Sequence, residues 1–115
     1  VKLTSPQKTA VDAFLRSLVE NPYSPPSDRI PEPDLLNLLI ERRSVVKTGD
    51  GVVFGAKSFD DMVAGVVDYI RSHEKVTLGE VRDLFKTSRR YAQSLLEYMD
   101  EKKITRRTGD DRVLY

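Results

Sequence analysis

Two stretches of this sequence match without a gap when residue 41 is placed on residue 101: Glu41-Arg42-Arg43-Ser44-Val45-Val46-Lys47-Thr48-Gly49-Asp50 and Glu101-Lys102-Lys103-Ile104-Thr105-Arg106-Arg107-Thr108-Gly109-Asp110. Glu, Thr, Gly and Asp are identical, and three further positions keep a positive charge. In the same alignment Leu35-Leu36 falls on Leu95-Leu96. Each stretch places a Thr-Gly-Asp turn signal beside short β-type runs, which is typical of a hairpin. The chain is therefore predicted to contain two copies of one supersecondary unit.

The residues around the second stretch complete a helical unit. From Phe59 to Ile70, apolar side chains recur at i, i+3, i+4, i+7, i+8 and i+11, which predicts an amphipathic helix. Ser58 with Asp61 resembles a shortened capping box at its start. The remaining elements follow in order: an extended link at 76–77, a helix over 78–85, a helix capped by Thr87 or Ser88 that runs to about Lys102, and a hairpin over 104–115.

The first copy has a longer connection between its helices. A helix is predicted from Ser5-Pro6 to Asn21-Pro22, because Ser followed by Pro is typical of a helix start and a later Pro ends the helix. Residues 22–33 hold five of the six prolines, so we expect an extended, partly rigid segment there. A helix over 33–43 and a hairpin over 44–54 follow.

A chain of 115 residues with 39% hydrophobic and 32% charged residues has the composition of a globular protein. The repeat and the helix spacing predict a mostly α chain with small β-hairpins (α+β). We expect two tandem winged-helix units, residues 1–57 and residues 58–115. Each unit is expected to consist of a helix, a short link, two helices and a two-stranded wing.

Basic side chains gather at the C-terminal end, although the net charge is only +1. Residues 1–85 carry 11 basic and 13 acidic side chains, whereas residues 86–115 carry 8 and 5. An anionic partner is therefore expected to bind the C-terminal end.

The sequence supplies little for catalysis. Without cysteine there is no disulfide, thiolate metal site or cysteine nucleophile, and the single histidine, His73, is expected at a solvated helix end. We therefore expect no enzyme, no metal and no cofactor. The longest apolar run, residues 35–40, is far shorter than the roughly 18 residues of a membrane span, so a cytoplasmic monomer is expected. The start at Val1 instead of Met is typical of a piece of a longer protein.

The candidate binding residues lie in the second unit. Ser88-Arg89-Arg90-Tyr91 opens the helix that corresponds to the recognition helix of helix-turn-helix folds, where free backbone N–H groups and side chains point toward an anion. The wing adds Arg106, Arg107 and Arg112. Adjacent strand residues point to opposite faces, so only one of Arg106 and Arg107 can face the same ligand. We favour Arg106, because Thr105 shares a face with Arg107 and is expected to be partly covered.

The residues leave alternatives open. The arginines would form an ordinary solvated surface if acids of the same unit paired with them, but five arginines on adjacent elements favour nucleic-acid binding. Tyr91 lies at helical spacing from Leu95 and Tyr98, which favours core packing over stacking on a base. A DNA-binding winged-helix pair and a protein-interaction module are the other function classes.

Several motifs of the second unit resemble the C-terminal end of the bacterial selenocysteine-specific translation elongation factors (SelB). These motifs are Val76-Thr77-Leu78-Gly79-Glu80-Val81-Arg82-Asp83-Leu84, Thr87-Ser88-Arg89-Arg90-Tyr91-Ala92, Leu95-Leu96-Glu97-Tyr98-Met99-Asp100, Thr105-Arg106-Arg107-Thr108-Gly109-Asp110 and Arg112-Val113-Leu114. The resemblance is strong over residues 76–114 and weak over residues 1–57. The family more often has Lys at the position of Arg90 and a basic residue at that of Asp111, so the wing turn of this chain is less basic.

The resemblance implies the last two winged-helix domains of such a factor, the final one binding the mRNA stem-loop called the selenocysteine insertion element. Carried over by position, it assigns RNA binding to Ser88, Arg89, Arg90, Tyr91, Arg106, Arg107, Gly109 and Arg112, with Arg89 reading the loop. In the first unit the helix before the wing begins with Glu32-Pro33-Asp34 in place of Ser88-Arg89-Arg90, and acidic residues there repel phosphate. Residues 1–57 are therefore expected to be a spacer and docking unit, and residues 58–115 the RNA-binding unit. The ribosome, GTP and selenocysteyl-tRNA would bind the full-length factor through domains that this chain lacks.

Overall fold

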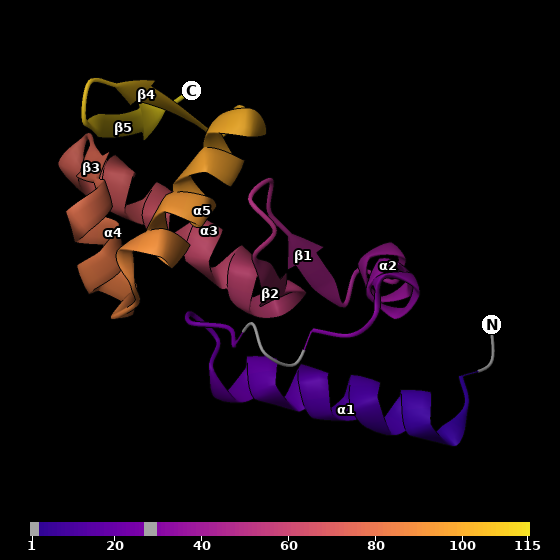
Figure 1. Cartoon of the computed structure of the whole chain (residues 1–115). Coiled ribbons are helices and arrows are strands. Elements are labelled where there is room, and N and C mark those ends of the chain that lie inside the picture. The colour runs from indigo at the N-terminus through magenta and orange to yellow at the C-terminus, as the bar shows by residue number, and fades with distance from the viewer. Residues whose placement is uncertain (1–2, 27–29) are drawn as a thin grey trace.

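The computed structural model describes residues 3–26 and 30–115. They form, in chain order, α1 (Ser5–Glu20), α2 (Pro33–Glu41), β1 (Val45–Lys47), β2 (Val53–Gly55), α3 (Ala56–His73), β3 (Val76–Thr77), α4 (Leu78–Phe85), α5 (Arg89–Glu101), β4 (Thr105–Thr108) and β5 (Asp111–Leu114) (Figure 1). The predicted fold class, mostly α with small β-hairpins, is confirmed. The chain is elongated, with extents of 49 × 24 × 20 Å. Within the described ranges, no helix is both long and apolar enough to cross a membrane.

The second copy of the repeat belongs to a complete winged helix made of α3, α4, α5 and a sheet. Strand β5 is the middle strand of this sheet and pairs antiparallel with both β3 and β4. The sequence predicted only an extended link at 76–77 and a two-stranded wing. The link becomes a third strand because Val76 is buried, and Thr77 also caps α4, its hydroxyl accepting from the Glu80 N–H at 3.1 Å. The start of α4 is thereby tied to the wing.

The first copy has no middle helix among its described residues, although the repeat predicted one. Helices α1 and α2 are joined by the proline-rich segment, and its described residues, 21–26 and 30–32, contain no α-helix. Prolines fix φ and remove backbone N–H donors, so a proline-rich segment does not favour the regular hydrogen bonds of an α-helix. Among the residues that the structure describes, the expected order of helix, link, two helices and wing is therefore present in full in the second copy and not in the first.

Two helix starts also differ from the prediction. Helix α1 is capped by Thr4, whose hydroxyl accepts from the Gln7 N–H at 3.3 Å, and not by Ser5. Helix α3 begins at Ala56, so Ser58 lies inside its first turn and does not cap it. The Ala56 amide still donates to the Ser44 carbonyl of the hairpin at 3.1 Å, which lets β2 run directly into α3 without a loop.

The repeat is visible in the backbone. Arg43 and Lys103, which align with each other, both follow a helix and both have a φ of 59°. The next amides, those of Ser44 and Ile104, donate to the carbonyl five residues earlier at 3.0 and 2.9 Å. A positive φ at this position turns the chain out of the helix and into the first wing strand. The two copies therefore share the helix-to-wing connection as well as its sequence.

Strands β1 and β2 serve two hydrophobic clusters. Val45 and Val53 are buried with α1 and α2 in the N-terminal cluster. Val52 and Phe54 are buried with α3, α4 and α5 in the C-terminal cluster, against which Val46 also packs. Because successive strand residues point to opposite faces, this hairpin contributes to both clusters at once. Figure 1 shows it between the α1–α2 pair and the helices α3 and α5.

Phe54→Ala is expected to lower the free energy of unfolding by about 3–5 kcal/mol, the usual cost of truncating a buried Phe. The Phe54 ring has an exposed fraction of 0% and lies 5.1 Å from the Phe59 ring between centroids. Urea denaturation monitored by circular dichroism measures the change. Val19→Ala is the control, because Val19 is 77% exposed and its truncation is expected to cost less than about 0.5 kcal/mol. A loss below about 1 kcal/mol for Phe54→Ala would contradict the packing described.

Candidate nucleic-acid interface

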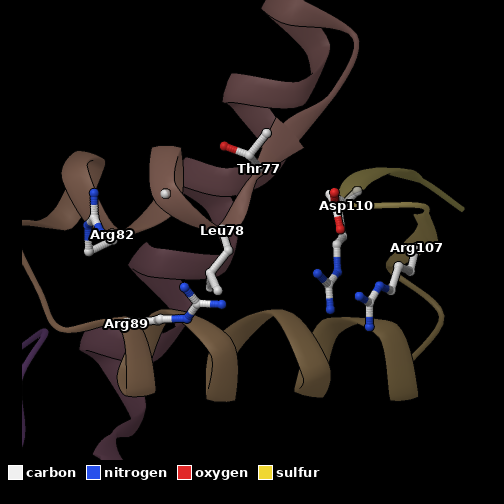
Figure 2. Close-up of a pocket in the computed structure, with 8 residues that line it drawn as sticks. Thr77, Leu78, Arg82, Arg89, Arg107 and Asp110 are labelled. Carbon is white, nitrogen blue, oxygen red and sulfur yellow. The ribbon is translucent and has the colours of Figure 1, made fainter.

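A basic hollow with a volume of about 370 Å³ lies between α4, the start of α5 and the wing. It is lined by Thr77, Leu78, Gly79, Arg82, Arg89, Arg107, Asp110 and Arg112. Four arginines thus surround one carboxylate and one large apolar side chain. In Figure 2 Arg89 extends from α5 beside Leu78, and Arg107 approaches from the wing. The hollow combines positive charge with a small apolar surface, which suits a polyanion that also carries a flat apolar group.

The start of α5 presents Arg89 to this hollow. Of the two predicted caps, Thr87 and Ser88, it is Ser88 that caps the helix, its hydroxyl accepting from the Tyr91 N–H at 3.4 Å, so the helix begins at Arg89. Arg89 is exposed, and no ion pair of the described residues involves it. The guanidinium therefore adds to the positive end of the helix dipole, where backbone N–H groups are also free to bind an anion.

On the wing it is Arg107, and not Arg106, that lines the hollow. The Arg107 Nε donates to the Gly109 carbonyl at 2.9 Å, which holds the side chain against the turn, and Gly109 adopts a φ of +66° there. The preference for Arg106 was based on the expected burial of Thr105, which is indeed buried. Thr105 is covered by the end of α5, however, and two residues farther out the same face of β4 is open.

Arg112 is buried, whereas the sequence grouped it with the exposed basic residues. Its side chain is only 9% exposed, and both its Nε and its Nη2 lie 3.2 Å from the Asp100 carboxylate. The other oxygen of Asp100 accepts from the Thr105 hydroxyl at 2.6 Å. Asp100 therefore links the end of α5 to both wing strands. Arg112 lines the hollow although most of its side chain is buried.

The four residues that open α5 do not share one surface. Arg90 and Tyr91 line a small cavity separate from the hollow, together with Pro25 and Gly51. The Tyr91 hydroxyl donates to the Pro25 carbonyl at 2.9 Å, and its ring meets Phe54 edge-on at 6.1 Å. The interpretation of Tyr91 as a packing residue is confirmed. Of the predicted site residues, the structure brings Arg89, Arg107 and Arg112 together and turns Arg90 and Tyr91 away.

Sequence reasoning missed Arg82. It lies on α4 and lines the hollow, where its Nε is 3.3 Å from the neighbouring Asp83 carboxylate in an exposed ion pair. Its spacing of three residues from Gly79 places both on one face of α4, and this was the available signal. The motifs of the recognition helix and the wing alone do not predict a contribution from α4.

The single histidine, His73, is the last residue of α3 and packs against Tyr69. The His73 ring stacks on Tyr69 with 4.1 Å between centroids, and its Nδ1 lies 3.0 Å from the Tyr69 carbonyl. The Tyr69 hydroxyl donates to Glu80 at 2.5 Å. This hydrogen bond lowers the pKa of Glu80 and raises the pKa of Tyr69. Within the described ranges, no cluster of three or more His, Cys, Asp or Glu residues is suited to a metal ion.

Comparisons with known proteins point to one family. A family model described as elongation factor SelB, winged helix, matches residues 68–114. A selenocysteine-specific elongation factor of Desulfomicrobium baculatum is 30% identical over 80 residues, which are 70% of this chain. This chain spans only 13% of the length of that relative.

Two solved structures are similar to this chain in fold. The mRNA-binding domain of elongation factor SelB from E. coli, in complex with SECIS RNA, matches with a TM-score of 0.71 at 16% identity, covering 97% of this chain and 98% of that one. The bacterial selenocysteine-specific elongation factor EF-Sec matches with a TM-score of 0.64 at 15% identity, covering 97% of this chain and 18% of that one.

Arg112→Ala is expected to lower the free energy of unfolding by about 1–3 kcal/mol, because it leaves the partly buried Asp100 carboxylate without its charged partner. Arg89→Ala removes an exposed guanidinium and is expected to change the same quantity by less than about 0.5 kcal/mol. Urea denaturation of both variants makes the comparison. Equal effects of the two substitutions would show that Arg112 is not the internal support of the wing.

Proposed function

We propose that this chain, whose residues 68–114 belong to the winged-helix family of elongation factor SelB, is the mRNA-binding module of a selenocysteine-specific elongation factor. Its ligand is the stem-loop of the selenocysteine insertion element. The observation that carries the proposal is the basic hollow, in which Arg89 from the recognition helix and Arg107 from the wing converge.

The groove geometry of RNA favours a loop over a duplex as the ligand of this surface. The major groove of A-form RNA is too deep and narrow for side chains to read, so sequence-specific proteins recognise unpaired bases in loops. Arginine planes stack on such bases and hydrogen-bond to their edges, while the same guanidinium groups attract phosphates. Arg89 has the position to read a base, and Leu78 offers an apolar surface beside it. Arg107 has the position to bind a phosphate.

The remaining site residues then have supporting roles. Ser88 fixes the first turn of α5, Gly109 holds Arg107 in place, and Arg112 supports the wing from within. We propose that residues 58–115 carry the RNA contacts and that residues 1–57 are a spacer and docking unit. The chain itself performs no catalysis in this proposal, and GTP, selenocysteyl-tRNA and the ribosome bind elsewhere on the full-length factor.

A titration of the full chain with three nucleic acids tests the proposal. The probes are a selenocysteine-insertion hairpin, a hairpin with the same stem and a scrambled loop, and a DNA duplex of equal length, measured by fluorescence anisotropy. The matched hairpin is expected to bind most tightly. Equal or tighter binding of the duplex would indicate a DNA-binding module, and no binding of any probe would indicate a protein-interaction module.

Arg89→Ala is expected to weaken binding of the matched hairpin by about 1–3 kcal/mol, the value of a good bidentate contact to a base. Calorimetric titration gives the affinity, and circular dichroism confirms that the variant is folded. An affinity equal to that of the unmodified chain would remove Arg89 from the site.

Arg107→Ala is expected to weaken matched and scrambled hairpins alike, because a phosphate contact carries no sequence information. It should also reduce the slope of log K against log salt concentration by about 0.7–0.9, the share of one phosphate. Arg106→Ala is the matched control, since Arg106 lies on the same strand but outside the hollow. A larger effect of Arg106→Ala, or a loss of sequence discrimination alone in Arg107→Ala, contradicts the assignment.

A further inference from the structure

Three hydroxyl groups, one just before α5 and two on it, donate hydrogen bonds to the N-terminal part of the chain. The Thr87 hydroxyl donates to the Tyr23 carbonyl at 2.6 Å, and the Tyr91 hydroxyl donates to the Pro25 carbonyl at 2.9 Å. The Ser94 hydroxyl donates to the Asp50 carboxylate at 2.5 Å. Tyr91 and Ser94 are three residues apart on α5 and therefore lie on one face of the helix, and Thr87 lies two residues before the helix begins. We call these three contacts the hydroxyl seam.

The acceptor at the far end of the seam is itself fixed. Asp50 lies in the turn of the first hairpin, and its second carboxylate oxygen accepts from the Thr48 hydroxyl at 2.5 Å. Partial burial alone would raise the pKa of Asp50, but the hydrogen bonds from Ser94 and Thr48 and the nearby Arg90 outweigh it and lower that pKa. The carboxylate is therefore charged at neutral pH, and a charged acceptor makes the Ser94 bond stronger than a neutral one.

Apolar packing closes the rest of this junction. The Tyr23 ring lies 5.1 Å from the Phe85 ring, just before the start of α5. The cavity left beside Arg90 and Tyr91 has a volume of only about 20 Å³. Hydrophobic contact alone is non-directional, whereas a hydrogen bond from a hydroxyl forms only within a narrow range of distances and angles. The seam therefore fixes the rotation and position of the first two turns of α5 against the N-terminal part.

We propose that the hydroxyl seam makes the N-terminal part of the chain a positioning element for RNA reading, although it contacts no RNA itself. Thr87 and Tyr91 flank Arg89 in the sequence, so fixing them fixes the direction in which the Arg89 side chain leaves the helix. A binding group held in advance loses less conformational entropy when the ligand arrives. This inference rests on the proposed function and assigns Thr87, Tyr91, Ser94 and Asp50 as positioning residues.

The test is made on the full chain with the triple variant Thr87→Val, Tyr91→Phe, Ser94→Ala, which removes the three hydroxyls and keeps the shapes of the side chains. Tyr98→Phe is the matched control, because it deletes the same atom from the same helix but on a ring that packs against Phe59 within the C-terminal cluster. Anisotropy titrations compare the matched hairpin with the scrambled one, and thermal unfolding followed by circular dichroism checks the fold.

The triple variant is expected to lose about tenfold in affinity for the matched hairpin and less than twofold for the scrambled one, with the salt slope unchanged because no phosphate contact is lost. Tyr98→Phe should leave both affinities within twofold. A folded triple variant that binds the matched hairpin normally, or that loses affinity equally for both hairpins, overturns the proposal. If the triple variant does not fold, Tyr91→Phe alone is used. It must lower the ratio of the affinity for the matched hairpin to that for the scrambled hairpin, and an unchanged ratio overturns the proposal.

Hydrogen–deuterium exchange separates this inference from the proposed function. If the unmodified chain does not distinguish the two hairpins, the proposed function fails. Whether the hydroxyl seam holds the start of α5 is then tested by amide exchange in the protein without RNA. The amides of residues 92–95, which are the first to donate hydrogen bonds to backbone carbonyls within α5, should then exchange faster in the triple variant than in the unmodified chain and in Tyr98→Phe. Unchanged exchange at these amides would show that the seam does not hold the start of α5.

Discussion

The alternation of side chains along the first hairpin is the constraint on which the rest of the structure depends. Val45 and Val53 face the N-terminal cluster, and Phe54 faces the C-terminal cluster. One short ribbon therefore closes two cores, neither of which is large. Separating the two parts of the chain would expose Phe54 and leave the partners of α5 unpaired, so the surface that carries Arg89 is held from behind by residues far away in the sequence.

The distribution of acids decides which arginines are free to act. Asp100 neutralises Arg112, Asp83 lies beside Arg82, and Asp111 pairs with Lys75 at 3.5 Å. These pairs occupy three carboxylates of the second unit, while Asp110 remains among the residues that line the hollow with Arg89 and Arg107. A net charge of +1 is thus compatible with a basic hollow, because within the described residues the guanidinium groups of Arg89 and Arg107 form no ion pair, and local pairing determines the field that a ligand meets.

Local features of the sequence predicted the local structure. A cap at Thr87 or Ser88 and the packing of Tyr91 follow from short-range preferences and helical spacing, and the structure has Ser88 as the cap and Tyr91 packed against the C-terminal cluster. The burial of Arg112 could not be predicted, because its partner Asp100 lies 12 residues earlier on a different element. The choice between Arg106 and Arg107 likewise depends on how far the wing extends past α5. Strand alternation separates the two residues but does not say which face meets the helix.

The repeat shows that identical residues in matching turns can have different roles. Asp50 and Asp110 occupy the same position in matching turns, yet Asp50 accepts a hydrogen bond from Ser94 and Asp110 borders the hollow. The helix-to-wing connection is the same in both copies, because it depends on backbone conformation alone. The surroundings differ, because the first turn lies against α5 and the second is exposed. Identical residues thus set the form of the two hairpins, while the element packed against each turn determines whether its carboxylate serves the interior or the binding surface.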